Sequence, residues 1–272
     1  MINGNTKVVG LIGNPVEHSF SPAMHNAAFD DLGLNYRYLA FKVEESALKR
    51  AIYGAENLGL VGLNVTIPHK INVLKYLNEL DPVAEKIGAV NTIDLRTLKG
   101  YNTDGVGAMR ALEEVTSLKG KNVVVAGAGG ASRAICFNLV EKNVGSLTIL
   151  NRNVEKAASL ASEMDVNSDS ITEISSYLED ADILIDTTPI GMDPNVNDKP
   201  IATSDMMHED LVVNDIVYNP LETVLLKEAS KANATTVSGL KMLLYQGVES
   251  FKIFTGVEAP VNVMENELLK LI

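Results

Sequence analysis

The stretch that most restricts how this chain can fold is VVVAGAGGASR, at positions 123–133. Three consecutive valines predict a buried strand, and the chain then passes through Gly127, Gly129 and Gly130 into a predicted helix at 131–142. A strand, a glycine turn and a helix start form an anion site, because the N–H groups at the helix start attract phosphate and glycines let it come close. Ser132 replaces the usual third glycine or alanine, so an ordinary tight turn remains an alternative.

The end of the next predicted strand indicates which dinucleotide such a turn would take. The segment LTILNRNVEK places Asn151 and Arg152 just after the strand and Lys156 one helical turn later, with no carboxylate at the selecting position. An acidic residue there binds the ribose of NAD, whereas an arginine accommodates the 2′-phosphate of NADP. The sequence therefore favours NADP(H) over NAD(H), and a simple surface arginine is the alternative.

Composition narrows the class of protein. The chain has 272 residues, of which 46% are hydrophobic and 21% charged, as expected for one large or two modest folded domains. A net charge of −12 argues against nucleic acid or an anionic membrane as partner, and no apolar run reaches the roughly 20 residues of a membrane span. The N-terminal segment does not resemble an export signal. The single cysteine, Cys136, excludes an intrachain disulfide, and we expect a cytoplasmic protein.

Hydrophobic periodicity predicts alternating strands and helices throughout, and hence an α/β fold with mainly parallel sheets. Predicted strands lie at 7–13, 36–43, 60–67, 90–94, 98–101, 122–126, 146–150, 183–187, 211–216 and 235–237. Predicted helices lie at 22–32, 45–58, 72–79, 83–87, 104–114, 131–142, 154–164, 222–232, 240–255 and 261–272.

Polar residues gather where strands of the first half end. Asn64 and Thr66 share one face of an apolar strand, and Lys70 follows it, at the sheet edge where open α/β folds bind ligands. Asn91–Thr92 and the run Asn102–Thr103–Asp104 also end strands. We interpret these groups as the pocket of a small polyol or hydroxy acid.

Two further features complete this predicted pocket. Lys70 and Asp104 are a plausible proton-transfer pair, since a lysine can protonate an oxygen that gains charge when hydride reaches a ketone, and a carboxylate can orient it. Ser19 and Ser21 precede a predicted helix; we expect Ser21 to cap it, and both hydroxyls could bind a carboxylate.

From these segments the chain resembles the shikimate dehydrogenase family almost end to end. The matching segments are GNPVEHSFSPAMHN (13–26), GLNVTIPHK (62–70), GAVNT (88–92), GYNTDGVG (100–107), GAGGASR (127–133), NR (151–152), TPIGM (188–192), DIVYNPLETVLL (215–226) and SGLKMLLYQG (238–247). The resemblance implies reversible NADPH-dependent reduction of 3-dehydroshikimate to shikimate. It also implies a substrate domain at 1–104 plus 241–272, a Rossmann-type NADP domain at 105–240, and a reaction cleft between them.

The resemblance also assigns residues to roles. Lys70 and Asp104 would be the catalytic pair. Substrate would be bound by Ser19, Ser21, Asn64, Thr66, Asn91, Asp104, Tyr218 and Gln246. The cofactor would be bound by Gly127, Ala128, Gly129, Gly130, Ala131, Asn151, Arg152, Lys156, Ile216 and Gly239.

Departures from the family pattern leave alternatives open. Asn153 and Lys156 stand where the family often has threonine and arginine, which would allow some use of NAD. The segment around Tyr38 resembles the quinate/shikimate dehydrogenase branch, which accepts quinate and either cofactor. Asn64 and Thr66 resemble the shikimate-specific branch, and we favour shikimate as the substrate. Asp186 stands where asparagine is frequent and has no explanation from the sequence. A non-catalytic NADP-binding sensor and a methylenetetrahydrofolate dehydrogenase are further alternatives. We expect no metal site, and a monomer or homodimer.

Overall fold

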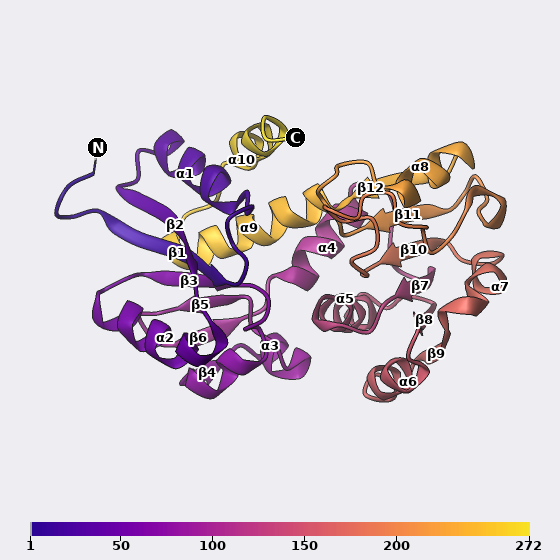
Figure 1. The fold of residues 1–272 in the computed structure, drawn as a ribbon, viewed down its shortest axis with the longest axis horizontal. Helices are drawn as coiled ribbons and strands as arrows, with labels where there is room; N and C mark the ends of the chain where they lie inside the picture. Colours follow the sequence, from indigo (N-terminus) through magenta and orange to yellow (C-terminus); the bar gives the residue numbers. More distant parts are fainter. Residues whose placement is uncertain (1) are drawn as a thin grey trace. The chain divides into compact units, whose positions relative to one another are not determined.

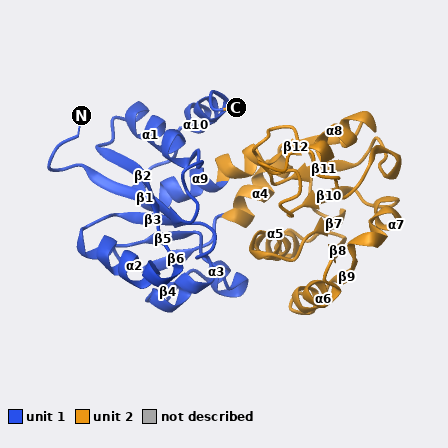
Figure 2. Ribbon diagram, viewed as in Figure 1, with its two compact units in different colours: residues 1–103, 246–271 blue, residues 104–245, 272 orange. Residues whose placement is uncertain are grey.

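The computed structural model describes residues 2–272, which divide into two compact units. Unit 1 contains the chain up to Thr103 together with Gln246–Leu271, and unit 2 contains Asp104–Tyr245 together with Ile272 (Figure 2). The sequence placed the corresponding boundaries after residues 104 and 240. Helix α9 (Gly239–Thr255) therefore contributes its first residues to unit 2 and the remainder to unit 1.

Unit 2 contains one parallel sheet of six strands, in the order β12-β11-β10-β7-β8-β9 (Figure 1). The strands are β7 (Asn122–Ala126), β8 (Ser146–Asn151), β9 (Asn167–Ser170), β10 (Ile183–Asp186), β11 (Val212–Asp215) and β12 (Thr235–Ser238). Read in chain order, this is the 3-2-1-4-5-6 arrangement of a Rossmann sheet. The strand order reverses between β7 and β10, so the glycine turn after β7 lies at the switch point where such folds bind dinucleotides.

Helices cover both faces of this sheet, and its strands are accordingly apolar on both sides. Val123, Val124 and Val125 are consecutive residues of β7, and none is more than 4% exposed, as expected for a strand buried on two faces. The helical segments are α4 (Asp104–Glu113), α5 (Gly130–Glu141), α6 (Val154–Ser162), η3 (Ile171–Glu173), α7 (Ile174–Leu178), η4 (Ser204–Met206) and α8 (Val224–Lys231). Sequence periodicity missed β9 and α7. The segment NSDS of β9 has no apolar alternation, and α7 has only five residues.

Unit 1 contains a mixed sheet of six strands in the order β2-β1-β3-β5-β6-β4. The strands are β1 (Lys7–Gly13), β2 (Tyr36–Lys42), β3 (Gly62–Val65), β4 (Glu79–Leu80), β5 (Thr92–Asp94) and β6 (Lys99–Tyr101). β1 pairs in parallel with β2 and β3, whereas β5 runs antiparallel to both β3 and β6. The sheet is thus mainly parallel, with one reversed strand beside β3.

The helical segments of unit 1 are α1 (Ser21–Asp31), η1 (Glu45–Ala47), α2 (Leu48–Asn57), η2 (Asn72–Tyr76), α3 (Pro82–Ile87) and α10 (Val261–Leu269), with most of α9. Three expectations were wrong in detail. The predicted helix at 45–58 begins as a 3₁₀ turn, and the predicted helix at 72–79 is a 3₁₀ segment followed by β4. Ser21 is the first residue of α1 rather than its cap, because Phe20 takes that position and no side chain caps the helix.

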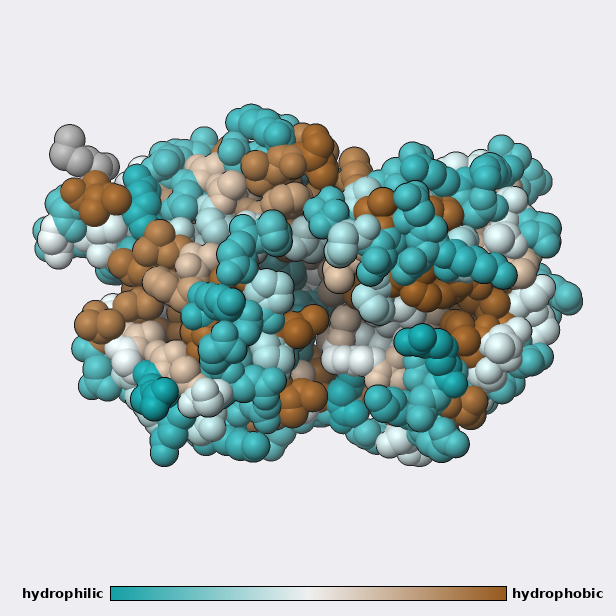
Figure 3. Space-filling model, viewed as in Figure 1, coloured by the Kyte–Doolittle hydropathy of each residue, from teal (hydrophilic) through white to brown (hydrophobic). Residues whose placement is uncertain are grey.

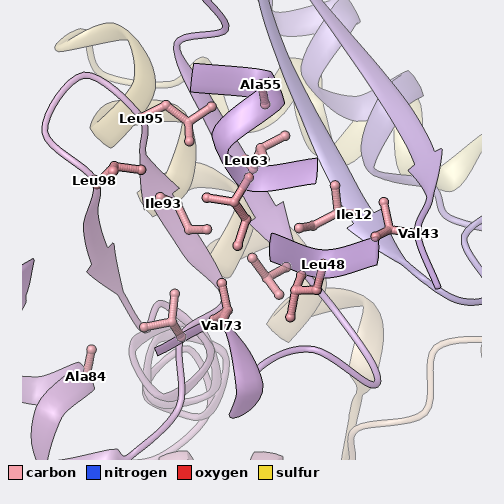
Figure 4. Close-up of a cluster of buried hydrophobic side chains, with 13 residues drawn as sticks. Ile12, Val43, Leu48, Ala55, Leu63, Val73, Ala84, Ile93, Leu95 and Leu98 are labelled. Carbon is pink, nitrogen blue, oxygen red and sulfur yellow. The ribbon is translucent and has the colours of Figure 1, made fainter. Parts of the chain in front are cut away.

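A core cluster of unit 1 is formed by aliphatic side chains from strands and helices far apart in the sequence. Figure 4 shows Ile12, Leu48, Leu63 and Ile93 converging there, and all four are at most 2% exposed. A second cluster in unit 2 contains Val124, Leu184, Val213 and Leu225. These buried layers fix the strand ends that carry the polar residues of the site.

On the face drawn in Figure 3, most of the surface is hydrophilic and apolar side chains form scattered patches. Within residues 2–272 we find no helix whose length and apolar character would let it cross a membrane.

Candidate active site

The glycine turn of unit 2 is constrained first by the protein's own packing. Gly127 has φ of +106°, and a Cβ on it would lie 2.3 Å from Thr187 Oγ1. Ser132 is fully buried, and its hydroxyl donates a hydrogen bond of 2.7 Å to the Gly127 carbonyl. The serine at the unusual third position therefore closes the turn from inside.

Gly129 and Gly130 are exposed, and a Cβ on either would meet no heavy atom of the protein within 4 Å. Packing within the chain does not require glycine there, whereas close approach of a phosphate to the backbone does. Gly129 caps the 12-residue helix α5 without a side-chain hydrogen bond, so the first N–H groups of the helix face outward as donors. This donor set fits the pyrophosphate of a dinucleotide.

The end of β8 offers two cations for a further phosphate. Arg152 and Lys156 are exposed, and within residues 2–272 neither forms a salt bridge. Arg133, by contrast, is engaged with Glu163 through a hydrogen bond of 2.8 Å. Asn153, one of the departures from the family pattern, caps α6 by accepting 2.7 Å from the Lys156 N–H. Its side chain is thus engaged with the backbone, which leaves Arg152 and Lys156 as the cations available to a 2′-phosphate.

The loop after β11 carries Ile216 and Tyr218, both half-buried. Burial raises the pKa of Tyr218. Gly239, the first residue of α9, lies against this loop so closely that a Cβ would come within 2.1 Å of the Ile216 carbonyl oxygen. Glycine at 239 is therefore required by contact between the loop and the helix, whatever it contributes to cofactor binding.

In unit 1, the Asn64 side chain is held by a buried network of hydrogen bonds. Its Oδ1 accepts 2.8 Å from the Tyr38 hydroxyl, and its Nδ2 donates to Thr92 Oγ1 at 3.0 Å and to the Asn91 carbonyl at 3.2 Å. Both amide hydrogens are thus used within the protein. Asn64 can therefore contact a ligand only through the remaining lone pair of Oδ1, as an acceptor from a donating hydroxyl.

Asn91 continues this network toward the end of the first half of the chain. Its Oδ1 accepts 2.8 Å from the Thr103 N–H, and its Nδ2 donates 2.9 Å to Thr103 Oγ1. Thr103 Oγ1 in turn donates 3.0 Å to the Gln246 carbonyl. The network therefore brings together strand ends and the helix α9 that are distant in the sequence, and three of the predicted substrate residues, Asn64, Asn91 and Gln246, lie along it.

The serine pair approaches the same network at its other end. Ser19 Oγ accepts 3.3 Å from the Ser21 N–H, and Ser21 is hydrogen-bonded to Tyr38. Burial raises the pKa of Tyr38, whose side chain is fully buried. Tyr38 thus joins Ser21 to Asn64. Sequence reasoning noted Tyr38 only as a feature of a family branch; the available signal was its place two residues after Tyr36 in an alternating strand, where both tyrosines are buried.

Lys70 follows β3 and is half-buried. Its carbonyl accepts 2.8 Å from the Val90 N–H, so its backbone is fixed beside the residue that precedes Asn91. The neighbouring His69 is fully buried and donates from Nε2 to the Val43 carbonyl at 2.7 Å, so it anchors the loop. Thr66, before the loop, is half-buried.

Asp104 is the first residue of α4 and is 6% exposed. The preceding residue, Thr103, is the one held by Asn91. Backbone and side-chain hydrogen bonds therefore attach Lys70 and the approach to Asp104 to the same short segment, Val90 and Asn91.

Family models match three parts of the chain. The model described as the shikimate dehydrogenase substrate binding domain matches residues 11–93, the one described as shikimate / quinate 5-dehydrogenase matches 109–218, and the shikimate 5′-dehydrogenase C-terminal domain matches 239–269. The shikimate dehydrogenase (NADP(+)) of Methanobrevibacter smithii is 64% identical over 99% of both chains. The chain belongs to the shikimate dehydrogenase family.

Solved structures of this family share the fold. A shikimate dehydrogenase crystallised in complex with NADP⁺ superposes with a TM-score of 0.95 at 53% identity, covering 99% of this chain and 97% of the other. The Listeria monocytogenes shikimate 5-dehydrogenase, in complex with shikimate and NAD, gives 0.90 at 38% identity, with 97% of each chain covered. The predicted family and fold class are confirmed.

Each unit holds its own set of the predicted site residues. Unit 1 brings Ser21, Asn64, Asn91 and Gln246 into one hydrogen-bonded chain. Unit 2 places the glycine turn at the switch point of its sheet. The sequence placed Thr92 and Thr103 among the polar strand ends of the pocket but gave neither a role, and the structure shows Thr92 hydrogen-bonded to Asn64 and Thr103 to Asn91. Among residues 2–272, His, Cys, Asp and Glu side chains form no group that could hold a metal ion.

Proposed function

We propose that this chain catalyses the reversible NADPH-dependent reduction of 3-dehydroshikimate to shikimate, as a shikimate-pathway oxidoreductase. The observation that carries the proposal is full-length identity of 64% to a shikimate dehydrogenase (NADP(+)), combined with a glycine turn whose exposed positions are free of contacts. The gathering of polar side chains in unit 1 supports a polyol as the substrate.

When bound, the cofactor supplies the hydride that reduces the substrate ketone. Gly127 to Ala131 and the start of α5 would hold its pyrophosphate, and Asn151, Arg152 and Lys156 its adenosine phosphate. Absence of a carboxylate at this strand end and the two unpaired cations support NADP over NAD. Ile216 and Gly239 would border the nicotinamide.

Lys70 is proposed to donate a proton to the ketone oxygen as the carbon is reduced, so that the ketone becomes an alcohol and the ammonium becomes an amine. In the reverse direction neutral Lys70 accepts the hydroxyl proton. Asp104 is proposed to accept a hydrogen bond from a neighbouring substrate hydroxyl and to orient the substrate. Attachment of Lys70 and of Thr103, the residue before Asp104, to the Val90–Asn91 segment supports this pairing.

The remaining substrate contacts follow from the donors and acceptors described above. Ser19 and Ser21 offer hydroxyls for the substrate carboxylate, with Tyr218 as a further donor. Asn64 is restricted to accepting from a ring hydroxyl, because both of its amide hydrogens are engaged. Thr66, Asn91 and Gln246 would line the same pocket.

A four-way assay tests this function directly. Purified protein is mixed with shikimate or quinate and with NADP or NAD, and formation of reduced nicotinamide is followed by absorbance. We expect the shikimate–NADP pair to give the highest kcat/KM. Comparable rates with quinate and with both cofactors would assign the chain to the quinate/shikimate branch, and absence of turnover with all four pairs would refute catalysis.

We further propose that the enzyme acts in the cytoplasm as a monomer or homodimer.

A further inference from the structure

Two buried carboxyl groups in unit 2 have no role in the proposed mechanism. Asp186 is the last residue of β10 and Asp215 the last residue of β11, and the register of this parallel pair sets them side by side. Neighbouring strands are about 4.8 Å apart, and register partners project to the same face of the sheet. Asp186 is 1% exposed and Asp215 is fully buried. Two carboxylates so placed cannot both carry a charge without a large cost.

The hydrogen bonds distinguish the two groups. Both oxygens of Asp215 accept: Oδ1 from the Val217 N–H at 2.9 Å and Oδ2 from the Thr223 hydroxyl at 2.6 Å. Asp186 accepts through Oδ1 from the Thr188 N–H at 2.8 Å and is also hydrogen-bonded by the Thr188 side chain. Separate residues donate to the two oxygens of Asp215, whereas Thr188 alone donates to Asp186. Because hydrogen bonds stabilise an anion, we assign the charge to Asp215 and a shared proton to Asp186.

The surroundings of Asp186 contain no compensating cation among residues 2–272. Its register partner on β7 is Ala126, and the loop after β10 brings Thr188. On the other side lies Asp215, and beyond it β12 brings Ser238. Burial, with the Asp215 charge adding to it, raises the pKa of Asp186 from 3.8 to about 7. Burial raises the pKa of Asp215 to about 6, against the opposing effect of its two hydrogen bonds.

The two carboxyl groups hold the loops that follow their strands. Asp215 fixes the start of the loop at Val217 and its end at Thr223, the cap of α8. Asp186 fixes the loop after β10 at Thr188. A backbone hydrogen bond of 3.1 Å from the Asp193 N–H to the Asn219 carbonyl joins these loops. Tyr218 and Ile216, to which the proposed function gives ligand contacts, lie in the loop held by Asp215.

We propose that Asp186 is a positioning residue that is neutral when the enzyme binds its cofactor, and that its ionisation loosens the Asp215-held loop and weakens NADP binding. The neutral carboxyl accepts from Thr188 without repelling Asp215. Loss of its proton places a second charge beside Asp215, in a site where neither charge reaches water. The inference rests on the proposed function for its ligand, NADP.

The test measures NADP binding by calorimetry at pH 6 and pH 8.5 for the wild type, Asp186→Asn and Asp215→Asn. Binding without substrate avoids the step in which Lys70 acts, and Asp186→Asn corrects for titration of NADP itself. A further rise of half to one unit in the pKa of Asp186 on binding corresponds to about threefold to tenfold in affinity. We therefore expect the ratio of Kd at pH 8.5 to Kd at pH 6 to be larger by about that factor in the wild type than in Asp186→Asn. In Asp215→Asn the pH at which affinity falls should move lower, because the neighbouring charge is absent.

A second measurement keeps the proposal testable if either variant fails to fold. Infrared titration of the wild type should show the carbonyl band of a protonated carboxylic acid disappearing between pH 6 and pH 8.5, where ordinary carboxyl groups, which titrate near pH 4, are already charged. Absence of that band, or parallel pH profiles of the wild type and Asp186→Asn, would overturn the inference while leaving the proposed function intact. Failure to bind NADP at either pH would instead refute the proposed function, and the infrared band would still report on the Asp186–Asp215 pair.

Discussion

Alanine at Gly129 and alanine at Gly127 should separate cofactor binding from folding, although the two positions are two residues apart. At Gly129 the backbone is extended, with φ of −96°, and a Cβ would meet no protein atom within 4 Å. We expect the free energy of unfolding of Gly129→Ala to change by less than about 1 kcal/mol, the scale of a changed helix cap. We expect the added methyl group to hinder the close approach of a phosphate to the backbone of the turn.

The expected loss of affinity follows from the hydrogen bonds at stake. A hydrogen bond to a charged group contributes about 1.5–3 kcal/mol, and 1.4 kcal/mol is a factor of ten. Displacing the pyrophosphate from one N–H donor should therefore raise the Kd for NADP by roughly tenfold to a hundredfold.

Gly127→Ala should act mainly on stability. An alanine would have to adopt the φ of +106°, which costs about 1–3 kcal/mol, with its Cβ 2.3 Å from Thr187 Oγ1. Thr187 donates 2.7 Å to the Ala126 carbonyl, and loss of that hydrogen bond costs about 1 kcal/mol more. A loss of about 2–4 kcal/mol should lower Tm by roughly 4–16 °C.

Thermal unfolding and calorimetric titration with NADP check both variants. Wild-type affinity in a folded Gly129→Ala would refute the view that the turn receives the pyrophosphate. Wild-type stability of Gly127→Ala would refute the steric argument for the turn itself.

Three further outcomes are expected. Lys70→Ala should keep NADP binding and lose kcat by roughly 10²–10⁴-fold, the scale of general acid catalysis. The control Lys75→Ala should keep both NADP binding and kcat. A loss of only a few-fold in Lys70→Ala would show that Lys70 takes no part in the proton transfer. Arg152→Ala should raise KM for NADP far more than for NAD, whereas equal effects on both would show that it does not contact the 2′-phosphate. Because the pKa of Asp186 is about 7 when folded and 3.8 ordinarily, the unfolded chain loses this proton first as pH rises. The folded state therefore loses up to ~4 kcal/mol between about pH 4 and 7, and Asp186→Asn, which has no such loss, should gain stability relative to the wild type from pH 5 to pH 8 in denaturant titrations.

Local sequence determined the elements and the cofactor turn. The valines of β7, the glycines after it and the amphipathic helices are patterns within a few residues, and backbone sterics and burial act on them directly. The same locality placed Arg152 and Lys156 at a strand end. It failed at β9, whose polar segment NSDS becomes a strand only because β8 offers it an edge.

Tertiary structure decided how polar groups from separate elements combine. Tyr38 donates to Asn64 Oδ1 because β2 and β3 flank β1. The amide hydrogens of Asn64 are used by Asn91 and Thr92 because β5 pairs with β3 on the other side. Asp186 meets Asp215 because β10 and β11 are neighbours in register. Strand order and register depend on the packing of the whole sheet, so no pattern within either strand contained these contacts. The sequence shows which polar residues are present. Only the pairing of the strands decides which of those residues share a hydrogen bond or a proton.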